Sequence, residues 1–215
     1  MGTIAAGFSM SLDGFIAGPN DDVLRLFAWM SLGNTDLNLS SGDTDFDLKV
    51  SSESAKGFEE AIKTTGAIVS GRRMFDVAGA WGGKHPLGAP AVVVTHTPPQ
   101  EWVYEGSPFT FVTDGVKSAI EKATVIAGDK NIGVGGADIT RQCIKLGLLD
   151  EIAIDLVPVL LGQGVRLFEY LGIEPIELES TGVRESPGVT HLSFRIVKQK
   201  TNPNTSQEHL LAQKG

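Results

Sequence analysis

Short apolar segments recur along the chain, separated by segments in which apolar residues keep a helical spacing. Seven of the short segments are rich in Val, Ile and Phe, and this composition predicts β-strands. They cover residues 3–9, 67–70, 91–95, 109–113, 131–134, 151–159 and 191–197. Several of them lack polar alternation, which is expected of strands that are buried on both faces of a sheet.

Three segments between these runs predict helices, because their apolar residues share one helical face. The stripes are Ala55, Phe58, Ile62 and Thr65; Val116, Ile120 and Ala123; and Ile139, Cys143 and Leu146. Asp114 can cap the second helix, and Asp138 or Thr140 can start the third. Strands that alternate with helices indicate an α/β fold with parallel strands. The last two strands follow each other without a helix, which predicts an antiparallel edge.

Two polar segments interrupt this order. Residues 31–53 are expected to form a long loop, and long loops inside compact domains often act as lids or binding segments. Residues 198–215 have no apolar pattern before Leu210, so we expect a disordered or loosely docked tail. The chain of 215 residues is therefore expected to hold one domain, residues 1–197, followed by this tail.

Composition and charge exclude several classes of protein. Hydrophobic residues make up 41% of the chain, which excludes disorder, collagen and coiled coils as the main structure. The longest apolar runs, such as residues 156–165, are far shorter than the roughly 20 residues of a membrane helix. The net charge is −8 and there is no basic stripe, so we expect no nucleic-acid partner. A single cysteine, Cys143, and no visible signal peptide predict a cytoplasmic protein.

Several reaction classes also lack their sequence signals. The four histidines have no metal-ligand spacing, so no metal site is expected. The chain has neither a P-loop nor the Gly-x-Ser-x-Gly turn that would anchor a hydrolase triad. The remaining candidates for chemistry lie where predicted strands end.

One of these strand ends carries a glycine pair. In residues 132–139, a strand is followed by Gly135 and Gly136 and then by the start of a helix. Glycines let backbone amides approach a pyrophosphate, and a helix N-terminus supplies partial positive charge. The alternative is a tight strand-to-helix turn without a ligand.

Two further strand ends carry side chains that suit a phosphate group. Residues 67–75 pass from a strand through Gly71 to the adjacent pair Arg72 and Arg73. Guanidinium groups bind phosphate through two donors, and a 2′-phosphate is what distinguishes NADP from NAD. An arginine pair can also be a solvated surface feature. With the hydroxyl of Thr95 at the next strand end, the three ends predict a crevice for a nucleotide.

The order of these motifs resembles the dihydrofolate reductase-like superfamily. The matching segments are SLDGFIA (11–17), GAIVSGRRMF (66–75), PAVVVTHTP (90–98), IGVGGADI (132–139) and LDEIAIDLVPVLLGQGVRLF (149–168). Within the superfamily, the chain is most similar to the stand-alone form of the C-terminal reductase domain of the bifunctional riboflavin-biosynthesis deaminase-reductase. The resemblance implies a three-layer α/β/α fold with a mostly parallel twisted sheet and an antiparallel C-terminal hairpin.

The resemblance also implies that NADPH is the cofactor. The residues it assigns to the cofactor site are Ser9, Ala17, Gly71, Arg72, Arg73, Thr95, His96, Val134, Gly135, Gly136, Ala137, Asp138 and Ile139. Asp138 is expected to cap its helix, with its charge turned away from the phosphates. The chain departs from the riboflavin reductase pattern at Val134, where a glutamate is usual.

These observations predict an NADPH-dependent reductase of a pyrimidine- or pterin-like heterocycle, of the 5-amino-6-(5-phosphoribosylamino)uracil reductase type. Dihydrofolate reduction and a non-catalytic NADP-binding role are the alternatives. The acid of dihydrofolate reductases falls near Ser54 or Ala55, with Glu53 only adjacent.

The candidate proton donors are Asp13, Glu53 and Asp155. Asp13 can instead serve its own turn, and Asp155 can instead face solvent on an edge strand. Trp29 and Trp81 could stack on a heterocycle or pack in the core. A homodimer is expected from the resemblance and from the apolar character of residues 151–168.

Overall fold

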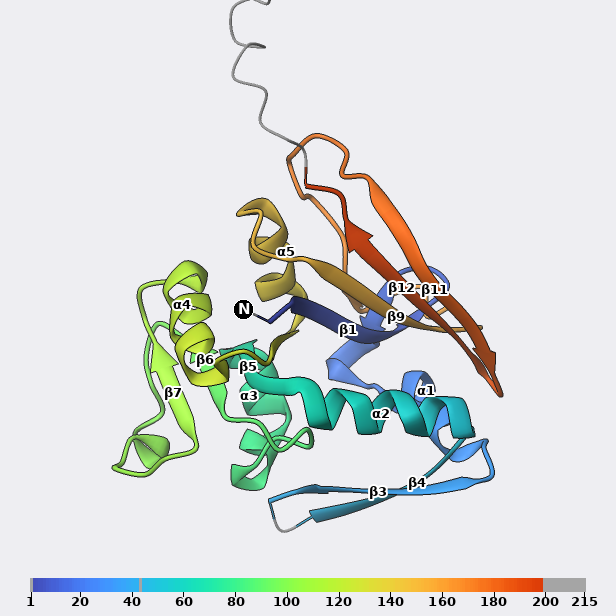
Figure 1. Cartoon of the computed structure of the whole chain (residues 1–215), viewed down its shortest axis with the longest axis horizontal. Coiled ribbons are helices and arrows are strands. Elements are labelled where there is room, and N and C mark those ends of the chain that lie inside the picture. The colour runs from blue at the N-terminus through green and yellow to red at the C-terminus, as the bar shows by residue number, and fades with distance from the viewer. Residues whose placement is uncertain (1, 43, 199–215) are drawn as a thin grey trace, which may run out of the picture.

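A twisted sheet of eight strands forms the centre of the computed structural model, which describes residues 2–42 and 44–198 (Figure 1). In spatial order the strands are β11 (Leu178–Ser186), β12 (Val189–Ile196), β9 (Glu151–Val157), β1 (Ile4–Ser11), β8 (Asn131–Gly135), β5 (Thr65–Gly71), β6 (Ala91–Val94) and β7 (Phe109–Val112). The strands from β9 to β7 are parallel, while β12 and β11 form an antiparallel hairpin beside β9. The predicted α/β fold with an antiparallel C-terminal hairpin is confirmed.

The helices and the minor strands lie around this sheet. The α-helices are α1 (Leu24–Phe27), α2 (Ser52–Thr64), α3 (Arg72–Val77), α4 (Val116–Ala127) and α5 (Ala137–Lys145). Short 3-10 turns are η1 (Pro19–Asp21), η2 (Ala28–Ser31), η3 (Gly79–Gly83) and η4 (Gln100–Trp102). Two small antiparallel pairs complete the fold, β2 (Phe15–Ala17) with β10 (Val165–Arg166) and β3 (Thr35–Ser41) with β4 (Thr44–Val50).

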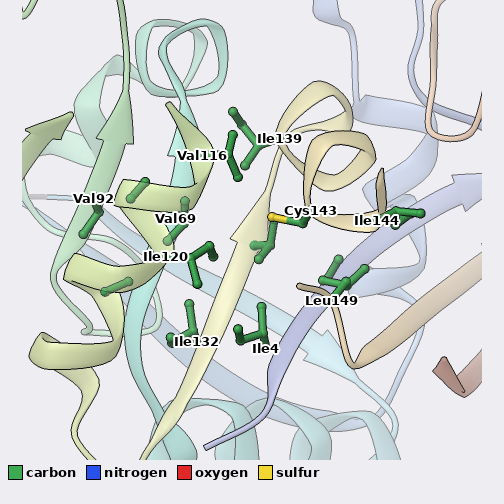
Figure 2. Packing of buried hydrophobic residues seen from close by; sticks show 14 of the residues in the cluster. Ile4, Val69, Val92, Val116, Ile120, Ile132, Ile139, Cys143, Ile144 and Leu149 are labelled. Atoms are coloured by element: carbon green, nitrogen blue, oxygen red, sulfur yellow. The ribbon is translucent and has the colours of Figure 1, made fainter. Parts of the chain in front are cut away.

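The main hydrophobic core lies between one face of the sheet and the helices α4 and α5. Figure 2 shows Val116 and Ile120 of α4 and Cys143 of α5 packed over Ile4 and Ile132 of the central strands. These side chains are at most 5% exposed, so the stripe predicted for α4 is confirmed as core. In the stripe predicted for α5, Ile139 and Cys143 are buried, but Leu146 is 52% exposed because it follows the last residue of the helix. Because side chains alternate along a strand, the residues between the core positions of β1, β8 and β9 face the other side.

The other face of the sheet has two smaller clusters with a gap between them. One cluster gathers Phe75, Trp81 and Phe109 over β5 and β6, and the other gathers Trp29 and Val157 near α1 and α2. Both tryptophans are buried, so core packing is confirmed for them.

Between these clusters Gly7 of β1 and Ala153 of β9 are exposed. A Cβ atom at Gly7 would contact only the Cβ of Ala153, at 3.9 Å. We call Gly7 and Ala153 the open strip of the sheet.

The long loop predicted for residues 31–53 is wrong, because most of this segment forms the β3–β4 hairpin (Figure 1). The hairpin pairs Leu37 with Leu48 and Leu39 with Phe46, so its apolar residues do alternate. The intervening Asp, Asn and Ser residues lower the mean hydropathy and hid this period of two. The segment is therefore a hairpin, and its expected role as a lid or binding segment stays a prediction.

The predicted helix starts also need correction. Gly115, with φ 102°, is the N-cap of α4 and no side chain caps that helix, so Asp114 is not its cap. Helix α5 begins at Ala137 after Gly136, so neither Asp138 nor Thr140 starts it. In both places a glycine with positive φ turns the chain from strand to helix, and this conformation needs no side-chain cap.

Strand β9 does not lie at an edge of the sheet, since β1 and β12 flank it. The edge strands of this sheet are β11 and β7, so residues 151–159 offer no free edge, and the homodimer stays a prediction. Within the described residues, no helix is both long and apolar enough to cross a membrane. The tail predicted for residues 198–215 lies outside the described residues except for Lys198, which pairs with Asp150.

Candidate functional site

The parallel strands β6, β5, β8 and β1 have their carboxyl ends on the same side of the sheet, and the predicted nucleotide motifs lie at these ends. Gly71 at the end of β5 is paired with Val94 of β6, directly before Thr95, and Ser70 is paired with Gly135 of β8. The carboxyl ends of parallel strands are where open α/β sheets bind their ligands. The structure therefore joins motifs that lie 24 to 64 residues apart in the chain, from residue 71 to residues 95 and 135.

The glycine pair forms an uncapped helix N-terminus at this edge. Gly136 is the N-cap of α5, has φ 90°, and makes no side-chain cap hydrogen bond. The first amide to bond back is that of Thr140, which donates to the Gly136 carbonyl at 3.1 Å. The amides of Ala137, Asp138 and Ile139 come before it and suit an anion.

Asp138 does not cap α5, which corrects the capping expected from the sequence. Its Oδ2 accepts a hydrogen bond from Nε2 of Gln142 at 2.7 Å, and its Oδ1 lies 4.0 Å from the guanidinium of Arg141. The carboxylate thus points toward the side chains of Arg141 and Gln142, one turn further along the helix. Its charge is balanced by Arg141 and not by the amides at the helix N-terminus.

A buried hydroxyl without a partner lies beside the glycine pair. The Oγ of Ser70 is the one buried side-chain polar atom in residues 2–42 and 44–198 that lacks a hydrogen-bond partner. A Cβ at Gly135 would lie 3.9 Å from the Cβ of Ser70 and 2.8 Å from the sulfur of Met74. Unpaired buried polar groups are rare in proteins, and a flexible methionine side chain next to one can move aside for a ligand.

Arg72 is held at the carboxyl end of β6. Its Nε donates to Asp76 at 2.7 Å and its Nη1 donates to the carbonyl of Thr97 at 2.7 Å. The hydroxyl of Thr95 donates to the same carbonyl at 3.0 Å, and His96 is exposed next to it. The guanidinium of Arg72 and the hydroxyl of Thr95 therefore meet at one carbonyl, that of Thr97.

Arg73 points elsewhere. Its guanidinium donates two hydrogen bonds to Oδ1 of Asp21, at 2.9 and 3.1 Å, and its side chain is 73% exposed. Of the adjacent arginines, only Arg72 lies with Thr95.

Ser9 and Ala17, assigned to the nicotinamide side by the resemblance, are both buried. The hydroxyl of Ser9 accepts from Nε1 of Trp29 at 3.1 Å, so this hydroxyl holds the indole. Ala17 is paired with Val165 of β10, and a Cβ at Gly164 would lie 2.0 Å from its carbonyl oxygen. The side chains of Ser9 and Ala17 are therefore part of the packing and are not exposed to a ligand.

Asp13 is a structural carboxylate and does not fit the role of proton donor. It accepts hydrogen bonds from the hydroxyl of Ser11 at 2.6 Å and from the amides of Leu161 and Gly162 at 3.1 and 2.7 Å. The Ser11 hydrogen bond, with help from these amides, lowers the pKa of Asp13 to about 2. At neutral pH it is ionised and joins the turn after β1 to the loop after β9.

Glu53 does not reach the site either. It lies on the exposed side of the first turn of α2 and pairs with Lys56 at 3.1 Å. The next residue, Ser54, is buried and faces the sheet. The helix position that is acidic in dihydrofolate reductases therefore presents a hydroxyl here.

Asp155 is the candidate acid that the structure connects to other polar groups. Its Oδ1 lies 2.6 Å from Nδ1 of His191 on β12, and Nε2 of His191 lies 2.8 Å from the hydroxyl of Ser54. The side chains of Asp155 and His191 are 32% and 12% exposed. Trp29 contacts the His191 ring edge-on, with 5.3 Å between the ring centroids.

This group is also next to the open strip. Asp155 is two residues beyond Ala153 on β9, so both side chains face the same side, and Asp155 is paired with Ser9 of β1. Gly7 lies between β8 with its glycine pair and β9 with its acid. The geometry therefore puts the glycine pair and the Asp155–His191 pair on either side of Gly7, which has no side chain.

Sequence analysis missed His191 and Ser54. His191 gives no local signal in the sequence, because its hydrogen-bond partners lie 36 and 137 residues away in the chain. The only local signal is the alternation in EIAIDLV, which predicts that Asp155 faces the same side as Ala153. The described residues contain no group of three or more His, Cys, Asp or Glu side chains that could hold a metal ion.

Comparisons with known proteins agree with this fold. The protein YyaP of Bacillus subtilis (strain 168) is 26% identical over 180 residues, which are 77% of this chain and 79% of YyaP. The crystal structure of a putative riboflavin biosynthesis protein from Shewanella sp. PV-4 matches with a TM-score of 0.71 at 20% identity, covering 91% of this chain and 99% of that one.

A second solved structure is a Thermotoga maritima diaminohydroxyphosphoribosylaminopyrimidine deaminase/5-amino-6-(5-phosphoribosylamino)uracil reductase. It matches with a TM-score of 0.57 at 14% identity, covering 91% of this chain and 57% of that chain. At such identities the structural matches show the fold alone. The sequence profile of the RibD C-terminal domain matches residues 3–192, which is most of the chain. The resemblance inferred from the motifs is thereby confirmed, and the chain belongs to the RibD C-terminal domain family.

Proposed function

We propose that the protein is an NADPH-dependent reductase of a pyrimidine-like heterocycle, of the 5-amino-6-(5-phosphoribosylamino)uracil reductase type. The observation that carries this proposal is the arrangement on either side of Gly7. The uncapped N-terminus of α5 lies on one side, and the Asp155–His191 pair lies on the other. A reductase needs both a nucleotide site and a proton source, with a reacting centre between them.

The residues at the sheet edge suit the parts of the cofactor in turn. The amides of Ala137 to Ile139 would hold the pyrophosphate, and Arg72 with Thr95 would hold the 2′-phosphate. The unpaired hydroxyl of Ser70 offers one more hydrogen bond beside the glycine pair. The open strip leaves room for a flat ring. When bound, NADPH supplies the hydride.

The remaining work falls to the protein itself. It positions the acceptor double bond over the strip and delivers a proton to the heteroatom that takes up the bonding electron pair. Family membership and the named activity of the Thermotoga maritima protein support a pyrimidine acceptor. No acid on α2 faces the site, since Ser54 stands there, and this disfavours folate.

The first experiment measures cofactor binding and use. Wild type should bind NADPH in preference to NADH and oxidise it when the phosphoribosylamino-uracil is added. Arg72→Ala should weaken NADPH by roughly 10- to 150-fold, because a hydrogen bond to a charged group contributes about 1.5–3 kcal/mol, and should leave NADH nearly unchanged.

Arg73→Ala is the matched control, because Arg73 pairs with Asp21 away from Thr95. An equal loss for both cofactors in Arg72→Ala would contradict the 2′-phosphate assignment. Tight NADPH binding with no oxidation by any pyrimidine would instead favour the non-catalytic NADP-binding alternative.

A further inference from the structure

Three serine hydroxyls meet behind His191. Ser51 is the N-cap of α2, Ser54 lies in its first turn, and Ser186 ends β11. Their Oγ atoms are 2.8 Å apart for Ser51 and Ser186, 2.9 Å for Ser51 and Ser54, and 3.3 Å for Ser54 and Ser186. We call these three residues the serine cluster.

The serine cluster lies between His191 and a pocket at the surface. On one side, Ser54 bonds Nε2 of His191 at 2.8 Å, and Nδ1 of His191 bonds Asp155 at 2.6 Å. On the other side, Ser186 lines a pocket of about 290 Å³. The other residues lining this pocket are Leu12, Leu156, Pro158, Glu185, Gly188, Val189 and Thr190. An unbroken line of hydrogen-bonding groups therefore runs from the pocket to the acid beside the open strip.

We propose that this line is a proton relay: Asp155 protonates the substrate, His191 holds the proton behind it, and the serine cluster reloads the pair from water in the pocket. The proposal rests on the proposed reductase function. Asp155 is then a catalytic residue, and His191 and Ser54 are positioning residues that act through Asp155.

The chemistry of one turnover balances. The carbon of the acceptor C=N or C=O bond gains a hydride from NADPH, and its π electrons become a lone pair on the nitrogen or oxygen. The Nδ1 proton of neutral His191 passes through the Asp155 carboxylate to that atom, while Nε2 takes a proton from Ser54, Ser54 takes one from Ser186, and Ser186 takes one from water in the pocket. The hydroxide that is left is neutralised by solvent, and return of the ring proton from Nε2 to Nδ1 through exchange with solvent restores the starting state.

The charges around His191 fit this role. Asp155 faces it from β9, and Arg184 lies opposite it on β11, where it is exposed. From α2, the nearest acid is Glu53, whose carboxylate pairs with Lys56 on the exposed side. Asp155 is thus the carboxylate that His191 bonds at Nδ1, and Ser54 is the hydroxyl that it bonds at Nε2.

The order Asp155, His191, Ser54 matches that of a hydrolase triad, but Ser54 is poorly suited to nucleophilic attack. It is 5% exposed, and its hydroxyl is held among Ser51, Ser186 and His191. A nucleophile must reach a substrate carbonyl, whereas a relay group only has to contact its two neighbours.

The deciding variant is Ser54→Ala, with Ser52→Ala as matched control. Ser52 lies in the same turn of α2 but is exposed. The first readout is the exchange rate of the His191 ring N–H with water, measured by NMR on ¹⁵N-histidine protein without cofactor and assigned by loss of the signal in His191→Gln. Ser54→Ala should slow this exchange on the order of tenfold, and Ser52→Ala should not. Ser186→Ala interrupts the relay at its other end and should slow it similarly.

The second readout is turnover with NADPH and the phosphoribosylamino-uracil. Ser54→Ala should lower kcat on the order of tenfold and raise the solvent deuterium isotope effect, while NADPH affinity stays within about twofold. Asp155→Asn should lower kcat by about 10²–10⁴, the usual contribution of a general acid. Ring exchange or kcat in Ser54→Ala equal to that in Ser52→Ala overturns the relay. A wild type that does not oxidise NADPH overturns the proposed function, and the exchange comparison, which needs no cofactor, still decides the relay.

Discussion

Replacing Gly136 by alanine separates the two reasons for which a glycine stands at this turn. Gly136 has φ 90° and ψ 137°, a backbone conformation that side chains with a Cβ rarely adopt. The added Cβ would have its nearest contact with the Cβ of Met74, at 3.8 Å, which is ordinary van der Waals distance. The cost to folding is therefore backbone strain without a clash, about 1–3 kcal/mol. For a chain of this size that lowers the melting temperature by roughly 2–12 °C.

The cost to cofactor binding has a separate origin. A methyl group at Gly136 stands where a diphosphate has to approach the first amides of α5. Loss of one hydrogen bond to a charged group costs about 1.5–3 kcal/mol, so NADPH should bind roughly 10- to 150-fold more weakly. Gly128 provides the matched control, because it has φ 61°, open space around its Cβ position, and a place at the C-terminus of α4 before β8.

Thermal unfolding followed by circular dichroism and titration with NADPH measure the two effects. Gly136→Ala and Gly128→Ala should lose similar stability, and only Gly136→Ala should lose NADPH affinity. A Gly136→Ala protein that binds NADPH as well as wild type would refute the assignment of the pyrophosphate to this turn. Unchanged stability in Gly136→Ala would refute the argument from backbone strain.

Three further predictions concern groups outside the reacting centre. Asp13→Asn should destabilise the protein at neutral pH. Because the folded pKa of Asp13 is lowered from 3.8 to about 2, the difference from wild type should shrink as the pH falls through that interval; a constant difference would contradict this. Burial lowers the pKa of His85 from 6.5 to about 4, so stability should fall as the pH drops from 6.5 toward 4, and His85→Gln should remove part of that slope in urea titrations. The hydroxyl of Ser41 bonds the carbonyls of Trp81 and Lys84, each at 2.9 Å, so Ser41→Ala should cost about 0.5–1.5 kcal/mol in urea unfolding, more than Ser40→Ala on the opposite face of β3.

The convergence of the strand-end motifs could be predicted because their signals are local. Gly71 and Gly135 end their strands, Thr95 follows its strand, and parallel strands end on the same side of the sheet. The direction in which a side chain points is not decided by its neighbours in the sequence. Arg72 turns to Thr97 while its neighbour Arg73 turns to Asp21, and the sequence gives no reason to separate them.

The alternation of strands and helices, the core stripe of α4 and the glycine turn before α5 can be read from the chain alone. All of these follow from the period of apolar residues and the conformational freedom of glycine within a few positions. The grouping of Asp155, His191 and Ser54, the structural role of Asp13 and the flanking of β9 on both sides emerge only from the folded molecule. Strand pairing and helix docking join residues that are 137 positions apart at Ser54 and His191 and 149 apart at Asp13 and Gly162, and the register that aligns His191 with Asp155 is set by the packing of the whole sheet.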